Sequence, residues 1–167
     1  MIKKILASIV AFSLFALLGY RVAEARNSTR THAEDRVQIE KLMWKYDRAL
    51  EGQNPDPYVA LYAPDGQFST GTNGFKGREA IRKMFVDLKK REANGSTPAR
   101  VVVMNLSSYL EFSDRDHAQM KGYWLEVSPR TGSNEPANIV GAGRDVNDFV
   151  RVKGQWLINL RDVAPKD

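Results

Sequence analysis

Residues 42–65 read LMWKYDRALEGQNPDPYVALYAPD, and this stretch decides the fold. Its first part belongs to a run of apolar residues three and four positions apart, which predicts an amphipathic helix over residues 34–52. The sequence Gly-Gln-Asn-Pro then stops that helix, and we expect Asp56 to cap a second short helix that runs through Tyr62. The sequence APDG at residues 63–66 predicts a turn, because Pro, Asp and Gly favour turns.

The rest of the chain predicts one more helix and a series of strands. We expect a short strand at residues 67–70, a loop at 71–77, a helix at 78–92, and strands at 100–112, 118–127, 138–152 and 155–163. Helices followed by a meander of long strands indicate an α+β fold. The three helices should pack on one concave face of a curved antiparallel sheet, because such a sheet can bury one side and leave the other in water.

The first 25 residues have the features of a signal peptide. Lys3 and Lys4 precede an uncharged apolar run at residues 5–20, and Ala-Glu-Ala at residues 23–25 fits the pattern that signal peptidase cleaves. The apolar run is shorter than the roughly 20 residues of a membrane-spanning helix. We therefore expect cleavage after Ala25 and a periplasmic or secreted protein that has no membrane contact afterwards. The alternative is an uncleaved N-terminal anchor.

Length and composition restrict the remaining choices. A chain of 167 residues has room for one domain after a signal peptide, and we expect a flexible N-terminus, the domain and a C-terminal tail at residues 26–33, 34–163 and 164–167. The absence of cysteine excludes disulfides, zinc–thiolate sites and a cysteine nucleophile. The net charge is +5, but the basic residues form no cluster with aromatic residues. This distribution disfavours nucleic-acid binding. The sequence predicts neither a metal nor a cofactor, because Asp114, Asp116 and His117 lack a fourth ligand.

Three segments, taken in order, carry a resemblance to a known family. They are residues 42–65, the sequence GFKGREAI at residues 74–81, and the sequence DFVRVKGQWLI at residues 148–158. Together they resemble the SnoaL-like branch of the nuclear transport factor 2-like superfamily, over nearly all of residues 34–163. The resemblance implies a cone-shaped α+β barrel. Relatives include ketosteroid isomerase, scytalone dehydratase, polyketide cyclases and many non-catalytic binding proteins.

Two residues of the first predicted helix are candidates for catalysis. Tyr46 shares a stripe with apolar residues and should face either the pocket of the cone or the core beneath it. The resemblance implies that Tyr46 donates a hydrogen bond to an oxyanion, whereas a core tyrosine with a locally bonded hydroxyl is the alternative. The resemblance also places Glu51 where relatives use a carboxylate, whereas a surface charge at the helix end is the alternative. Asp47, one turn earlier, is expected to be solvated.

The strand predicted at residues 138–152 supplies a third candidate. One of its two alternating sets of residues is mostly valine and alanine but includes Arg144 and Asp148. The resemblance aligns Asp148 with the protonated, hydrogen-bond-donating aspartate of the isomerases, and this implies an oxyanion pair of Tyr46 and Asp148. The alternative is that the other set faces inward, namely Ile139, Gly141, Gly143, Asp145, Asn147 and Phe149.

The acid–base residues of the relatives are incomplete in this chain. In the alignment that the resemblance gives, the general-base aspartate of the isomerases falls at Thr70. The histidine of the dehydratases falls at Val101, four residues before Asn105. His117 lies in a predicted hairpin turn and His32 near the N-terminus, so neither is placed to replace the missing base. Family membership by itself therefore does not supply a reaction.

Three functions remain open from the sequence. The first is an exported protein that binds a small, mostly apolar, aromatic or polycyclic molecule in its cone, with ligand contacts from Trp44, Tyr62, Phe68, Asn105, Trp124 and Arg144. The second is a cofactor-independent isomerase or lyase that uses Tyr46, Asp148 and Glu51. The third is a non-catalytic module that forms a homodimer through its open sheet face.

Overall fold

The computed structural model describes residues 32–95, 102–128 and 138–166. Contacts divide the chain into two units, Met1–Val37 and Gln38–Asp167. A first helix occupies residues 32–51, so that the described part of the first unit is the start of this helix. Residues 1–31, which hold the predicted signal peptide, lie outside the described residues.

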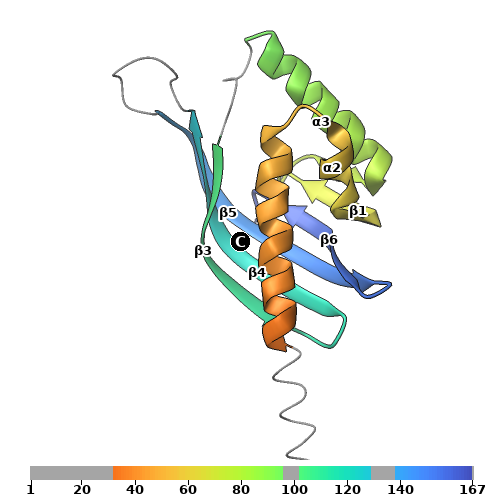
Figure 1. Ribbon diagram of the computed structural model, residues 1–167. Helices are drawn as coiled ribbons and strands as arrows, with labels where there is room; N and C mark the ends of the chain where they lie inside the picture. The colour runs from red at the N-terminus through yellow and green to blue at the C-terminus, as the bar shows by residue number, and fades with distance from the viewer. Residues whose placement is uncertain (1–31, 96–101, 129–137, 167) are drawn as a thin grey trace, which may run out of the picture. The chain divides into compact units, whose positions relative to one another are not determined.

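The second unit holds the rest of the first helix and every other described element. These are α2 (Pro55–Ala60), β1 (Tyr62–Ser69), β2 (Gly74–Lys76), α3 (Gly77–Ala93), β3 (Val102–Phe112), β4 (His117–Ser128), β5 (Asn138–Val152) and β6 (Gln155–Asp162). The strands form one sheet in the order β2-β1-β6-β5-β4-β3. Within this unit the helices lie on one side of the sheet (Figure 1).

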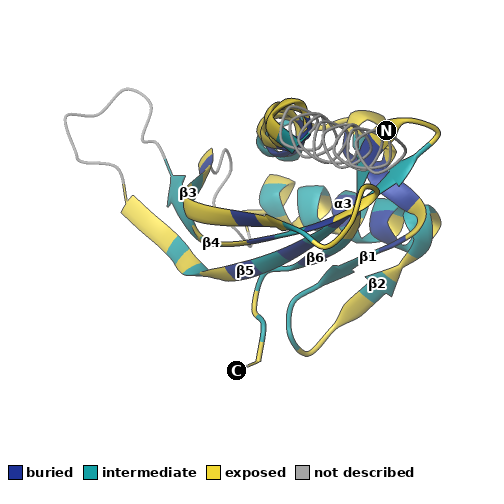
Figure 2. Ribbon diagram, turned by 90° about the horizontal axis from the view of Figure 1, so that it is seen from below, coloured by how far each residue is buried: buried dark blue, intermediate teal, exposed yellow. Residues whose placement is uncertain are grey.

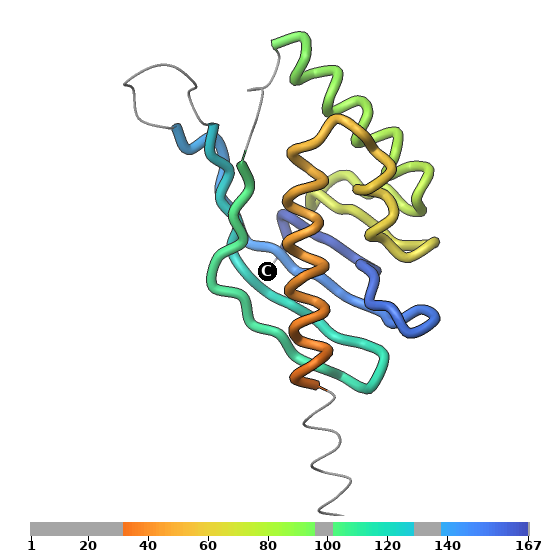
Figure 3. Tube along the Cα trace, viewed as in Figure 1, coloured from red at the N-terminus to blue at the C-terminus, as the bar shows by residue number. Residues whose placement is uncertain are grey.

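The predicted fold class is confirmed, because helices pack on one face of a curved sheet. Two features of the sheet differ from the predicted antiparallel barrel. The sheet does not close into a barrel, since β2 and β3 end it as separate edges. It is also mixed, because β1 pairs with β6 in parallel while the other neighbours are antiparallel. Figure 3 shows how the long strands β3, β4 and β5 bend past the first helix.

The stretch around α2 differs in detail from the prediction. Asn54, not Asp56, caps the helix: its side-chain oxygen accepts a hydrogen bond from the Asp56 backbone nitrogen at 2.9 Å, and Pro55 occupies the first turn. The predicted turn at residues 63–66 lies inside β1, where the register with β6 shifts. Gly66 allows β1 to lie close to β6 at this point, because a Cβ there would lie 2.8 Å from the Ile158 carbonyl oxygen.

The core lies between the helices and the inner face of the sheet. Side chains from the first helix, α2, α3 and the sheet form one buried cluster, which includes Ile39, Met43, Tyr58, Ile81, Phe85, Phe149 and Ile158. The spacing on the first helix is the one that the sequence predicts. Burying each such side chain contributes roughly 1.5–3 kcal/mol, so this cluster is what positions the first helix against the sheet (Figure 2).

The inner face of the long strands follows directly from burial. Leu110 on β3 and Met120 on β4 are buried, and on β5 the buried residues are Asp145, Asn147 and Phe149. The alternating set of β5 that contains Arg144 and Asp148 therefore lies on the outer face. The structure therefore matches the alternative in which Asp145, Asn147 and Phe149 face inward, and the interpretation that places Asp148 inside is wrong. In the described ranges, no helix has both the length and the apolar character to cross a membrane.

Candidate functional site

Three tyrosine hydroxyls form a chain inside the unit. Tyr46 on the first helix is 2% exposed, and its hydroxyl lies 3.1 Å from that of Tyr58 on α2. The Tyr58 hydroxyl lies 3.2 Å from that of Tyr62 at the start of β1. Burial raises the pKa of Tyr58 and of Tyr62 well above the ordinary value, so both remain protonated. Three hydroxyl protons serve two hydrogen bonds within the chain, which leaves one O–H group to donate elsewhere.

Arg161 on β6 connects three strands beneath the first helix. Its side chain is 1% exposed, and Nη1 donates to Asp145 Oδ2 at 2.8 Å and to Asn147 Oδ1 at 2.7 Å. Nη2 donates to Asn105 Oδ1 at 3.3 Å. The guanidinium also stacks on the ring of Tyr46, 4.3 Å from the centroid. A buried arginine with this many partners is held in one orientation.

Asp47 extends this network toward the first helix. Asn105 Nδ2 donates to both carboxylate oxygens of Asp47, at 2.7 and 2.8 Å. Burial raises the pKa of Asp47 from 3.8 to about 6, although the positive charge of Arg161 and the Asn105 hydrogen bond both act to lower it. The expectation that Asp47 is solvated is therefore wrong. A carboxyl group that titrates near neutral pH can accept and return a proton.

A cavity of about 110 Å³ lies next to these groups. Its lining comes from the first helix, α2, α3 and four strands: Tyr46, Leu50, Tyr58, Phe68, Met84, Leu88, Val103, Trp124, Glu126, Arg161 and Val163. Most of these side chains are apolar, and Tyr46, Tyr58, Arg161 and Glu126 supply the polar groups. Burial, with a smaller effect of Glu92, raises the pKa of Glu126.

Trp124 is fixed within the cavity wall. Its indole Nε1 donates to the Val163 carbonyl at 2.9 Å and to the Arg144 carbonyl at 3.2 Å. The ring lies against Gly141 and Gly143 on β5, where a Cβ would come within 3.0 and 2.8 Å of it. The glycines therefore provide the space that the indole occupies, and the indole nitrogen needs no ligand to satisfy it.

The structure brings together part of the predicted site. Tyr46, Phe68 and Trp124 line the same cavity, while Tyr62 joins the tyrosine chain and Asn105 the arginine network. Trp44 does not join them, because it is 63% exposed. Arg144 lies on the outer face.

The predicted pair of Tyr46 and Asp148 does not form. The hydroxyl of Tyr46 lies beside Tyr58, whereas Asp148 on the outer face accepts a hydrogen bond from Gln119 Nε2 at 2.8 Å. Glu51 is half-buried at the end of the first helix and pairs with Arg48, one helical turn earlier, at 2.6 Å. This matches the alternative in which Glu51 is a helix-end charge.

Sequence reasoning missed Asp47 and Arg161, which are central to the network. The signal for Asn147 and Asp145 was present, since both belong to the alternative inward set of the β5 strand. A lone arginine on a short strand gives no such signal, because its partners come from β3 and β5. Among the described residues, no group of three or more histidine, aspartate and glutamate side chains is arranged to hold a metal ion.

Comparison with known protein families identifies the family of this chain. Residues 31–162 match the family described as the SnoaL-like domain. The chain belongs to the SnoaL-like domain family. The resemblance that the sequence segments carry is thereby confirmed, and the match covers all the residues of the network described above. No curated protein matches the sequence.

Several solved structures share this fold. One from Novosphingobium aromaticivorans, named as a candidate scytalone dehydratase, is 25% identical with a TM-score of 0.65, covering 80% of this chain and 85% of that one. An NTF2-like protein with a cystatin-like fold from the same organism is 18% identical with a TM-score of 0.68, covering 84% and 87%. A cystatin-like-fold protein from Nostoc punctiforme is 22% identical with a TM-score of 0.65, covering 79% and 91%.

Proposed function

We propose that this SnoaL-like protein binds a small, mostly apolar molecule in the cavity between the first helix, α3 and the inner face of the sheet. The observation that supports this proposal is the cavity itself, in which an apolar wall surrounds a few convergent polar groups. This combination is typical of small-molecule sites, where the polar groups orient the ligand and the apolar wall supplies affinity.

The volume of the cavity sets the size of the ligand. A buried apolar cavity of roughly 150 Å³ encloses one benzene molecule, and the cavity here is about 110 Å³. The proposal therefore concerns molecules of up to about one ring, which is narrower than the polycyclic range that the sequence leaves open.

Two matched variants test ligand binding. Val103→Phe places a larger side chain in the cavity lining, while Val102→Phe adds the same bulk at the exposed neighbouring residue of β3. A panel of monocyclic ketones and phenols is titrated while tryptophan fluorescence is recorded, since Trp124 lies in the wall. We expect binding to wild type and to Val102→Phe and at least a tenfold loss in Val103→Phe. Equal binding by both variants, or no binding to wild type, would reject this cavity as the site.

A second function, proton transfer to and from a bound carbonyl compound, is favoured by a different observation. Asp47 has a pKa of about 6, and Asn105 and Arg161 connect it to the cavity wall. Asp47 does not itself line the cavity, so in this proposal its carboxylate turns away from Asn105 toward the bound ligand. It then removes a proton from the carbon next to the carbonyl, and the remaining O–H of the tyrosine chain donates to the enolate oxygen. In an isomerase the proton then returns from Asp47 to a different carbon of the conjugated enolate, whereas in a lyase the enolate expels a leaving group, which takes up the proton.

Exchange of carbon-bound hydrogen for deuterium tests this second function. Cyclohexenone is incubated with the protein in D₂O and followed by NMR. We expect exchange to rise with pH through a pKa of about 6 and to fall by at least about a hundredfold in Asp47→Asn, a typical loss for a general base. Glu40→Gln is the control, because Glu40 is an exposed carboxylate on the same helix and should leave the rate unchanged. A rate equal to that of buffer would contradict catalysis without affecting the binding proposal.

Export is part of the same proposal. It is supported by the signal-peptide pattern of residues 1–25, which lie outside the described residues. A periplasmic or secreted location would expose the cavity to molecules that enter from outside the cell. Detection of the protein without residues 1–25 in a periplasmic or culture fraction, by intact mass, tests this location.

A further inference from the structure

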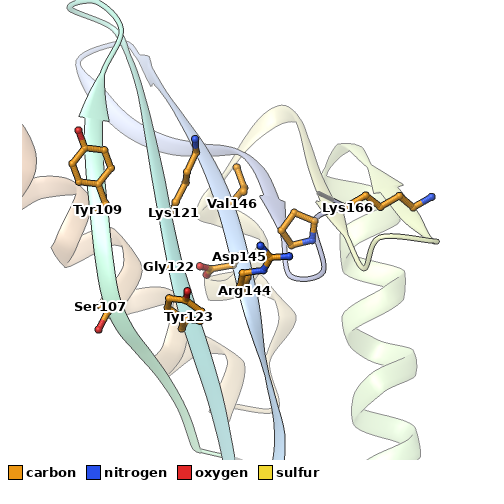
Figure 4. Close-up of a pocket in the computed structure, with 10 residues that line it drawn as sticks. Ser107, Tyr109, Lys121, Gly122, Tyr123, Arg144, Asp145, Val146 and Lys166 are labelled. Atoms are coloured by element: carbon orange, nitrogen blue, oxygen red, sulfur yellow. The ribbon is translucent and has the colours of Figure 1, made fainter.

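A second and larger hollow lies on the outer face of the sheet. Its volume is about 400 Å³, and it is lined by Ser107, Tyr109, Lys121, Gly122, Tyr123, Arg144, Asp145, Val146, Pro165 and Lys166 (Figure 4). Tyr109 and Lys121 are exposed, while their neighbours Leu110 and Met120 are buried on the inner face. This outer groove is therefore separate from the cavity beside Tyr46, and its volume is within the range of small-molecule sites.

An irregularity in β3 shapes the outer groove. The register between β3 and β4 shifts between Leu106 and Tyr109, and Ser107 has a positive φ of 44°. Such a bulge redirects the side chains that follow it, and here it brings Tyr109 to the outer face. Gly122 on β4 has no side chain at this point, where a Cβ would lie 3.1 Å from Asp145 Oδ1 and 3.3 Å from the Leu106 carbonyl oxygen.

Positive charge dominates the lining of the outer groove. Lys121 and Arg144 project from neighbouring strands, and Lys166 adds a third cation at the rim. The one acidic lining residue, Asp145, is 4% exposed, and its carboxylate already accepts a hydrogen bond from Arg161 at 2.8 Å. Its charge is therefore largely compensated from the inner side, and the groove favours an anion.

Two tyrosines give the outer groove aromatic surface. Tyr109 is 62% exposed and Tyr123 is 55% exposed. Side chains of this size more often bury most of their surface. Val146 and Pro165 add apolar surface to the same lining. Rings stack favourably on tyrosine, and an attached anionic group would lie within reach of the lysine and arginine side chains.

We propose that the outer groove is a binding site for a small aromatic anion, meaning a flat ring that bears a carboxylate or a similar group. The ring packs against Tyr109 and Tyr123, and the anionic group binds Lys121 and Arg144. This site is independent of the cavity beside Tyr46, so neither proposal requires the other.

The test uses 2-naphthoate as the anionic probe and 2-naphthamide as its neutral counterpart, titrated into the full chain by calorimetry. We expect 2-naphthoate to bind and 2-naphthamide to bind at least about tenfold more weakly, because a charge-assisted hydrogen bond contributes roughly 1.5–3 kcal/mol. Lys121→Gln and Arg144→Gln should each weaken 2-naphthoate binding about tenfold. Raising the salt concentration should weaken it further.

Two controls separate the outer groove from other sites. Lys153→Gln removes an exposed cation from the turn between β5 and β6 and should leave affinity unchanged. Val103→Phe, which fills the inner cavity, should also leave it unchanged. Equal affinity for both probes, or wild-type affinity in Lys121→Gln and Arg144→Gln, overturns the proposal. So does loss of 2-naphthoate binding in Val103→Phe, or a dimer in sedimentation that binds no 2-naphthoate.

Discussion

At the scale of single residues, Asp47 carries the least compensated charge in the network. Arg161 has a carboxylate partner at 2.8 Å in Asp145, whereas Asp47 is held by the neutral amide of Asn105. A carboxylate that loses water without gaining an adjacent cation has a raised pKa, and its ionisation opposes folding. The same property that suits Asp47 for proton transfer therefore reduces stability.

This reasoning predicts how Asp47→Asn changes the pH dependence of stability. Between pH 3.8 and about 6 the folded state keeps a proton on Asp47 that the unfolded state has released. The contribution of Asp47 to the free energy of unfolding therefore falls as pH rises through this window, and stays low above it. We expect Asp47→Asn to remove this fall and to be more stable than wild type at pH 8, by about 1–2 kcal/mol after allowance for partial exposure.

Urea unfolding of wild type and Asp47→Asn at pH 4, 5, 6 and 8 measures the difference directly. Taking the difference cancels the contributions of the other titrating groups, which both proteins share. Glu40→Gln serves as a control on the same helix and should leave the slope unchanged, since the Glu40 side chain is exposed. A constant difference between wild type and Asp47→Asn across this range would contradict the raised pKa.

At the scale of the elements, β4 and β5 fit together through a tryptophan and two glycines. The Trp124 indole occupies the space where Gly141 and Gly143 lack side chains, and its nitrogen bonds to the carbonyl of Val163 just after β6. This arrangement holds β4, β5 and the end of β6 together at the cavity wall. A change at Gly143 is therefore transmitted to the cavity through the indole.

Gly143→Ala is predicted to displace the Trp124 ring. The new Cβ would lie 2.8 Å from three indole atoms, closer than packed side chains allow. Overpacking of this kind costs about 1–3 kcal/mol. We expect that loss in urea unfolding, together with a shift of tryptophan emission to longer wavelength as the ring moves toward water. Ala142→Val, at the exposed neighbouring position of β5, should change neither quantity, and unchanged emission in Gly143→Ala would refute the packing argument.

At the scale of the whole molecule, the sheet exposes apolar side chains near the starts of β3 and β5. Val102, Met104 and Leu106 on β3 are 36–44% exposed, and Ile139 and Val140 on β5 are 68% and 41% exposed. Contiguous exposed apolar surface of this kind marks contact sites. We propose that the partner on this surface is a second copy of the chain, in agreement with the homodimer expected from the sequence.

Sedimentation velocity tests this self-association. We expect a dimer at micromolar concentration and a monomer for Leu106→Lys, because a charge on β3 would be buried without a partner in the interface. Lys153→Gln, in the turn after β5, should remain dimeric. A wild-type monomer at 100 µM would rule the homodimer out, and it would leave both binding proposals standing. A dimer through Leu106 would cover Tyr123, its cross-strand neighbour in the outer groove, so dimerisation and 2-naphthoate binding should compete.

Some of this molecule is predictable because neighbouring residues decide it. The three helices and four long strands follow from spacing along the chain, and Tyr46 and Trp124 were placed at the cavity from the sequence. The choice between the two alternating sets of β5 was not predictable from their composition. Counting apolar residues favoured the set with Asp148, yet Arg161 on β6 makes Asp145 and Asn147 the stable inward residues.

Local sequence was enough to predict the order of helices and strands, because apolar periodicity and turn residues act over a few positions. Tertiary structure alone decided which charges lie inside. A buried carboxylate or guanidinium is tolerable only where other strands bring it hydrogen-bond partners. Asp47, Asn105, Asp145 and Arg161 meet from four separate elements, so that no local pattern marks them as one network.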